Sequence, residues 1–539
     1  MLKRYQNYER TISIQEAFFY GFFFLLSVTK GLGFYEWQKV FILLVIPALI
    51  LGFLKVLFTP YTKGQAVVVA LVLLLTAVVF WQSHQIAVFF VVFTVLGMKG
   101  MSVKKVLHLA VWVWTVCSIL LSVVSFFRLE HTVYRVHAKL GLGHIFRWSL
   151  GFTHPNLLHI TYLFLCALAI LKLEERYGWK SYFLLMLGNL AVFFYSISYT
   201  GFGIVALLLT CGLYVRLRPR FCLLEKLLAN LVLPVCLALS FVLPFFLYDH
   251  PLCGYVQRLN FILNTRIWLA EQFLRSEYTS LFGANVSKVV KSSMNMDCSY
   301  IWCYINYGLF FTVVILLGYL CLQFYETHKQ RTGELVVLVC FFAAGWTEQL
   351  LFNTSFKNIT LLFLGELLFL QKEGKAEYSL LFLIPEKFRE ITIPLAGLPD
   401  KLFLEARAVC KAHKSRVCIC VAAGAVLGLL LCLLLYREPV GYLVPRSYTD
   451  GQIAMEEAVY LESADDADWS GYRILNYKDA ETPMQIISGK AIWLETARYY
   501  LGSVLIGGVV GAFAAILWNM RKRRRKAAMA VTEISGWDA

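Results

Sequence analysis

The sequence predicts an all-α polytopic membrane protein. Of its 539 residues, 59% are hydrophobic and only 16% are charged, which leaves too little polar surface for a soluble chain of this length. Uncharged apolar runs recur along the chain, and many approach the roughly 20 residues that a helix needs to cross a bilayer. The runs are continuous rather than alternating, which disfavours a transmembrane β-barrel.

Roughly fourteen apolar runs account for the predicted helices. Their cores are residues 15–33, 40–58, 66–82, 86–98, 106–127, 157–172, 181–198, 202–216, 228–248, 301–323, 335–352, 358–370, 417–436 and 500–520. We interpret these runs as about twelve transmembrane helices in a domain over 1–372, followed by a transmembrane hairpin over 417–520. The first run follows a basic start without a small-residue cleavage site, so we expect an uncleaved signal anchor.

The basic residues of the short loops predict the orientation. Counted from a cytoplasmic N-terminus, the inside loops include "KGMSVKK" (99–105), "KLEERYGWK" (172–180) and "RLRPRFCLLEK" (216–226), and the tail is "RKRRRK" (521–526). Lys and Arg accumulate on the cytoplasmic side of membrane proteins. We therefore expect an even number of spans with both termini in the cytoplasm. The net charge of +16 has the same explanation, so it gives no reason to expect a nucleic-acid partner.

Two long loops, 128–156 and 249–300, are then external, and the larger one lies between helices 9 and 10. Both are basic, although the positive-inside rule does not require external arginines. The residues concerned are Arg128, Arg135, Lys139, Arg147, Arg258, Arg266, Arg275, Lys288 and Lys291. An anionic substrate at the outer face is the simplest reason for them. The alternative is contact with lipid phosphates.

The stretch 258–283, "RLNFILNTRIWLAEQFLRSEYTSLFG", has apolar residues at helical spacing. It predicts an amphipathic helix on the outer leaflet, with Arg258 at the edge of the apolar stripe and Arg266 inside it. The planar guanidinium suits a phosphate because it donates two parallel hydrogen bonds. Snorkelling arginines on an interfacial helix are the structural alternative.

"RWSLGFTHPNLLHI" (147–160) places polar groups at the mouth of a span. Pro155 holds the preceding His154 extended at the membrane boundary, where its imidazole could take a proton from an acceptor hydroxyl. A purely structural interfacial histidine is the alternative. Further along, Asp297 precedes a span and is expected to cap it. Gly308 lies within that span and permits close helix packing.

The C-terminal third has a different composition. Residues 373–416 are mixed in polarity and predict a cytoplasmic interfacial linker. Within the hairpin, the external segment 437–499 is net acidic, and residues 521–539 form a basic cytoplasmic tail. The hairpin is either a regulatory or partner-binding module, or a pair of helices around a solvated loop.

Four motifs, in order, resemble the O-antigen polymerase and ligase superfamily, in particular the Wzy-like polysaccharide polymerases of Gram-positive bacteria. They are "SLGFTHPN" (149–156), "LNFILNTRIWLAEQFLRSEYTSLFG" (259–283), "DCSYIWCYINYGLFF" (297–311) and "TEQLLFNTSFKNITLLFLG" (347–365). The resemblance covers about residues 1–372. This chain departs from the family in having Tyr199 where the family often has an arginine and Cys298 where it has an asparagine.

The resemblance implies a metal-independent glycosyltransferase of the bacterial cytoplasmic membrane that has no cofactor. Such an enzyme polymerises oligosaccharide units carried on undecaprenyl diphosphate into capsular or exopolysaccharide at the outer face. Its partners are that lipid-linked substrate and membrane lipids, and a co-polymerase or chain-length regulator would be a further partner. The expected catalytic residues are His154, Arg266 and Arg258, and the expected substrate-binding residues are Arg147, Asn156, Trp148, Trp268, Asp297 and Glu348.

Two other activities stay open at this point. A ligase of the same superfamily uses the same donor but transfers the glycan to another acceptor. A lipid-linked oligosaccharide flippase is a rival from another class, although transporters usually place ionisable residues near the bilayer midplane. The sequence gives neither the sugars nor the linkage.

Overall fold

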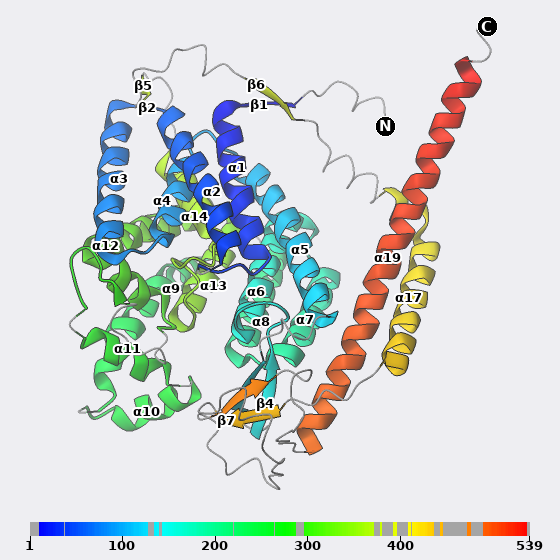
Figure 1. The fold of residues 1–539 in the computed structure, drawn as a ribbon. Coiled ribbons are helices and arrows are strands. Elements are labelled where there is room, and N and C mark those ends of the chain that lie inside the picture. Colours follow the sequence, from blue (N-terminus) through cyan, green and yellow to red (C-terminus); the bar gives the residue numbers. More distant parts are fainter. Residues whose placement is uncertain are drawn as a thin grey trace. The chain divides into compact units, whose positions relative to one another are not determined.

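The computed structural model describes residues 10–36, 38–127, 134–139, 143–218, 220–248, 250–263, 265–276, 278–286, 296–370, 378–379, 392–395, 408–410, 412–435, 442–445, 472–475 and 489–535. Within these residues the chain is built of α-helices, and its few short strands form only two-stranded ribbons (Figure 1). The prediction of an all-α polytopic membrane protein is thus confirmed.

Each of the predicted apolar runs corresponds to a helix. These helices are α1 (Ile14–Gly31), α2 (Lys39–Phe58), α3 (Lys63–Ser83), α4 (Ala87–Gly97), α5 (Val103–Phe127), α6 (Pro155–Leu173), α7 (Trp179–Ser196), α8 (Tyr199–Leu217), α9 (Leu223–Phe241), α12 (Ser299–Lys329), α13 (Thr332–Thr347), α14 (Thr360–Leu368), α17 (Lys414–Leu435) and α19 (Gly489–Ser535). Among the described residues, nine helices are long and apolar enough to cross a membrane, and α4 and α13 are shorter apolar helices.

The chain separates into two compact units. The bundle unit comprises residues 12–121 and 152–393, and the hairpin unit comprises 1–11, 122–151 and 394–539. Residues 122–151, which include most of the loop predicted over 128–156, therefore group with the C-terminal hairpin. Most of the predicted linker 373–416 and of the acidic segment 437–499 lies outside the described residues.

In the bundle unit, α12 is interrupted at Gly308, whose φ of 81° lies in the left-handed region. The segment around Gly283 (φ 94°) packs against the interruption. Three backbone hydrogen bonds join the two: Leu309 N donates to Ser280 O, Phe310 N to Leu281 O, and Ala284 N to Ile305 O. These bonds replace bonds of a continuous helix. The segments "LFG" (281–283) and "YGL" (307–309) are thus in contact.

The single amphipathic helix predicted over 258–283 is wrong. The stretch forms two short helices, α10 (Cys253–Ile262) and α11 (Arg266–Leu274). Between them Thr265 has a φ of 63°. Asn260, in the last turn of the first helix, accepts a hydrogen bond from Thr265 N through its carbonyl oxygen and one from Trp268 N through its side chain. These bonds stabilise the break between the two helices. The apolar stripe is nevertheless used, since Ile267 packs in a small core with Leu247 and Val256.

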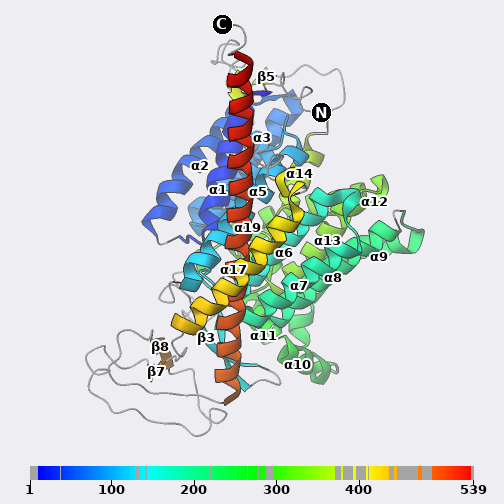
Figure 2. The ribbon, with the colours of Figure 1, turned by 90° about the vertical axis from the view of Figure 1, so that its right-hand side faces the viewer.

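In the hairpin unit, α17 and α19 run side by side (Figures 1 and 2). Their backbones touch along two glycine pairs four residues apart, "GAVLG" (424–428) and "GGVVG" (507–511). Small residues at this spacing allow close helix approach in membranes. The same unit holds the ribbon of β3 (Tyr134–Lys139) and β4 (Gly143–Trp148).

Replacing Gly507 by Ala is expected to destabilise the hairpin by about 1–3 kcal/mol. A Cβ at this position would lie 2.2 Å from the carbonyl oxygen of Gly424, so the helices must move apart. Gly508→Ala is the matched control, because its Cβ would lie 3.6 Å from the nearest atom. Thermal unfolding of the two purified variants compares them, and equal midpoints would show that α17 and α19 do not pack closely.

Candidate functional site

Three ionisable side chains form one ionic cluster in the bundle unit. Arg266 Nη2 lies 2.6 Å from Glu348 Oε1, and Arg266 Nε lies 3.2 Å from Asp297 Oδ2. Thr200 Oγ1 also donates a hydrogen bond to Glu348 Oε1 at 3.0 Å. We refer to Arg266, Asp297 and Glu348 as the ionic cluster. It joins three of the residues that the sequence predicted as a site.

Every member of the ionic cluster lies at the end of a helix. Arg266 is the first residue of α11, and Glu348 is the C-cap of α13. Asp297 precedes Cys298, which is the N-cap of α12 and makes no side-chain capping bond. The prediction that Asp297 caps this helix is therefore wrong: its carboxylate pairs with the guanidinium instead, a charge-assisted contact that a cap does not offer.

Ser299 fixes the backbone that carries Glu348. Its hydroxyl donates to Glu348 O at 2.6 Å and accepts hydrogen bonds from the amides of Leu350 and Leu351. The serine thus ties the end of α13 to the beginning of α12. This arrangement fixes the backbone from which the Glu348 side chain extends.

The ionic cluster is largely removed from water. Side-chain exposure is 10% for Arg266, 7% for Glu348 and 31% for Asp297. Burial alone would lower the pKa of Arg266, but the carboxylates of Glu348 and Asp297 outweigh it and raise that pKa above its usual range. Burial raises the pKa of Glu348, and Arg266 opposes this shift. The guanidinium therefore stays charged, and Asp297 is the carboxylate more open to solvent.

The two ion pairs use only some of the hydrogen-bond donors of the Arg266 guanidinium. It has five N–H donors, and two of them serve the carboxylates. The other three have no partner among the described residues. In the same residues, Glu348 Oε2 and Asp297 Oδ1 also accept no hydrogen bond. The ionic cluster can therefore offer both donors and acceptors to a ligand.

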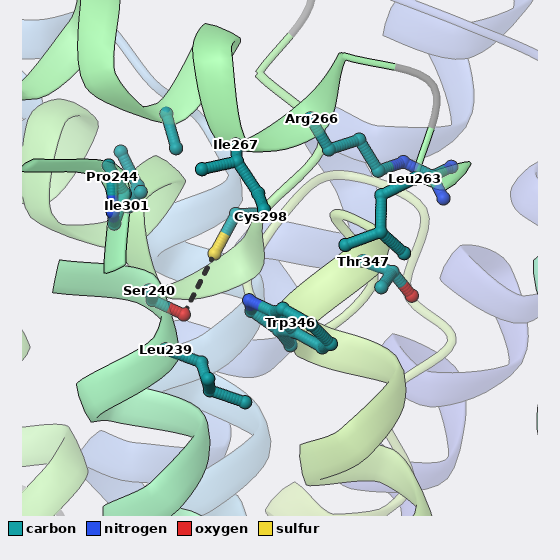
Figure 3. Close-up of a pocket in the computed structure, with 11 residues that line it drawn as sticks. Leu239, Ser240, Pro244, Leu263, Arg266, Ile267, Cys298, Ile301, Trp346 and Thr347 are labelled. Atoms are coloured by element: carbon teal, nitrogen blue, oxygen red, sulfur yellow. Dashed lines mark hydrogen bonds between the residues drawn. The ribbon is translucent and has the colours of Figure 1, made fainter. Parts of the chain in front are cut away.

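A small pocket lies beside Arg266, lined by residues that include Ser240, Cys298 and Trp346 (Figure 3). Its volume of about 10 Å³ accommodates about one water molecule. Figure 3 shows the guanidinium directed away from the contact between Cys298 Sγ and Ser240 Oγ. A sugar does not fit a pocket of this volume.

His154 is the N-cap of α6, and its Nδ1 accepts a hydrogen bond from the backbone amide of Asn156 at 3.1 Å. A neutral imidazole that accepts at Nδ1 carries its proton on Nε2. In this geometry Nδ1 of His154 can take a proton only by giving up the cap. Its predicted role as a base stays a prediction.

The remaining predicted residues lie outside the ionic cluster. Arg258 is exposed on α10 and has no ion pair among the described residues. Trp268 is half-buried on α11, two residues from Arg266. Arg147 and Trp148 belong to the hairpin unit, where they end strand β4 opposite Arg135 and Tyr134. The tryptophan ring lies 6.3 Å from that of Phe126.

The sequence reasoning missed a polar network next to Thr200. His159 is fully buried, and its ring contacts Ser196 Oγ at 3.0 Å and Asn189 Oδ1 at 2.8 Å. Gly201 packs directly on the imidazole. The network joins α6, α7 and α8 and so positions the turn that carries Thr200. A second histidine one turn and a half after His154 was the available signal.

Comparison of the chain with protein-family models, with curated proteins and with solved structures finds no match.

Proposed function

We propose that the protein polymerises undecaprenyl-diphosphate-linked oligosaccharide units into capsular or exopolysaccharide at the outer face of the bacterial cytoplasmic membrane. The observation that carries the proposal is the ionic cluster. It joins Arg266, Asp297 and Glu348, which come from three of the four segments that resemble the polymerase superfamily. Its arginine and its carboxylates suit the two charge changes of the reaction.

The reaction needs positive charge at the leaving group and a proton acceptor at the attacking hydroxyl. The hydroxyl oxygen of the acceptor sugar bonds to the anomeric carbon of the donor, and the bond from that carbon to the diphosphate oxygen breaks. The electron pair stays on the diphosphate, where the three remaining N–H donors of Arg266 would stabilise it. Asp297, the most exposed carboxylate, would take the hydroxyl proton.

The position of the ionic cluster favours transfer over transport. Transporters place ionisable residues near the middle of their spans. Here Arg266 begins a short helix outside the candidate spans, Asp297 precedes α12 and Glu348 follows α13. The charges therefore gather at helix ends, where a lipid-linked glycan would meet them.

Purified protein in liposomes, supplied with undecaprenyl-diphosphate-linked repeat units, tests this function. We expect a ladder of lipid-linked glycans that grows by one repeat unit per step. Transfer of a finished glycan to another acceptor, with no ladder, would instead identify a ligase. Repeat units that cross the bilayer without change in length would identify a flippase.

A further inference from the structure

Lys357, one of several buried cations, lies in the segment between α13 and α14. Lys357 is 3% exposed, and among the described residues it has no hydrogen bond and no ion pair. Its ammonium lies 5.4 Å from the ring centre of Trp114 and 5.7 Å from that of Phe152. Aromatic faces attract a cation, but they do not replace the hydrogen bonds that water gives it.

The surrounding segment holds Lys357 in place. Loops usually lie at the surface, yet residues 350–352 and 355–359 are buried. Tyr307 and Asn358 donate hydrogen bonds to the carbonyl oxygens of Phe352 and Leu351. Phe356 has a φ of 54° and packs its ring against those of Phe22, Phe23 and Phe90. The backbone that carries Lys357 is therefore held in place, and the ammonium lies beside two aromatic rings.

Three more buried donors have no hydrogen-bond partner among the described residues: Ser27 Oγ, Trp114 Nε1 and Ser118 Oγ. Ser118 is one helical turn after Trp114 on α5. Ser27 lies on α1 one turn after Phe23, which touches Phe356, and one turn before Gly31, which touches Trp114. Helix periodicity therefore turns Ser27 toward the segment of Lys357 and toward α5.

Among the described residues, no carboxylate pairs with Lys357. The charged group that acts on it is another cation, Lys30. Glu36 acts on Lys30 instead, and the Lys30 ammonium already donates a hydrogen bond to Phe34 O. Burial, with a smaller contribution from Lys30, lowers the pKa of Lys357 to about 7. A charged lysine here is stable only with an anion beside it.

We propose that Lys357, with Ser27, Trp114 and Ser118, binds a phosphate group. The ammonium and the indole N–H only donate hydrogen bonds, and the two hydroxyls can donate as well. A tetrahedral oxyanion accepts from several such donors at once. The phosphate is that of a membrane lipid or of a free ion, since both present the same oxygens. The site stands apart from the ionic cluster, and its existence does not depend on glycan transfer.

Binding is tested on the full chain, purified in a maltoside detergent that contains no phosphate. Inorganic phosphate and phosphatidic acid are added separately, and the thermal unfolding midpoint is measured. We expect phosphatidic acid to raise the midpoint of the wild type, whether or not inorganic phosphate also raises it in its own experiment. A ligand that binds only the folded state stabilises that state. Lys357→Met should abolish the rise, and Lys39→Met, at an exposed lysine, should retain it.

A response to both probes assigns the site to the phosphate group itself, and a response to phosphatidic acid alone assigns it to a lipid. A wild type that responds to neither probe overturns the proposal. So does an unchanged response in Lys357→Met. If that variant does not fold, the double variant Ser27→Ala/Ser118→Ala should weaken binding by about tenfold, since each hydroxyl hydrogen bond contributes modestly. Unchanged affinity in the double variant would also contradict the proposal.

Discussion

Replacing Arg266 by Lys is expected to reduce polymer formation by about 10²-fold or more while the protein still inserts into the membrane. Lysine keeps the positive charge, but it lacks the planar guanidinium of arginine. The guanidinium bonds Glu348 and Asp297 and still has three N–H donors left for a diphosphate. Loss of one hydrogen-bond donor at a developing negative charge typically costs 10²- to 10³-fold in rate. Polymer yield and length in cells, and the ladder formed in liposomes, measure the effect.

Arg275→Lys is the matched control, because Arg275 lies one residue after the same helix with its side chain 57% exposed. Its ion pair with Glu271 is partly solvated and should contribute little. Arg266→Ala is a less clean test, since it leaves the buried Glu348 and the half-buried Asp297 without their ion-pair partner and should destabilise the fold by about 3–5 kcal/mol. Wild-type yield and length in Arg266→Lys would contradict the proposed role.

Replacing Gly308 by Ala is expected to prevent normal folding of the bundle unit, at a cost of about 4 kcal/mol or more. A Cβ there would lie 2.3 Å from the amide nitrogen of Gly283 and 2.5 Å from Leu281 O. These are backbone atoms that cannot rotate away. The φ of 81° also disfavours any side chain, and separation would break the three hydrogen bonds to the 280–284 segment.

Gly333→Ala provides the comparison, because nothing lies within 4 Å of a Cβ at that position. The yield of monodisperse protein after detergent extraction and the thermal unfolding midpoint should fall for Gly308→Ala only. A folded Gly308→Ala protein with a wild-type midpoint would show that the interrupted helix is not required.

The transmembrane helices were predictable because the length and continuity of an apolar run are local properties. Even the short buried helices α4 and α14 appeared as apolar runs. The interruption between α10 and α11 was not predictable in this way. It depends on Asn260, whose side chain bonds the amide of Trp268, and on the apolar contacts of Ile267 with a preceding segment. Periodicity alone continued the helix through that point.

The candidate site was predicted in its parts but not in its contacts. Arg266 was notable as a charge within an apolar stripe, and Glu348 and Asp297 came from motif order. Arg266 lies 82 residues from Glu348 and 31 residues from Asp297 in the sequence, so local patterns do not reveal that they pair. Each residue also had a local explanation of its own, such as a helix cap for Asp297. Lys357 had no local signal at all, because its lack of a partner is visible only in three dimensions.

In the hairpin unit, by contrast, the spacing of the glycines in the sequence already indicates a close contact between two helices. Two glycine pairs at four-residue spacing, "GAVLG" and "GGVVG", are typical of closely packed membrane helices. Their alignment at the contact between α17 and α19 follows directly from that spacing.

The proposed reaction requires the ionic cluster to face the outside of the cell. Phe261, 72% exposed on α10, and Leu224, 62% exposed at the start of α9, are each replaced by Cys. Intact cells are treated with a membrane-impermeant maleimide, and labelling above that of the parent protein is measured. We predict that Phe261→Cys is labelled in intact cells and Leu224→Cys only after permeabilisation. Labelling of Phe261→Cys only after permeabilisation would place Arg266 in the cytoplasm and contradict the proposed reaction.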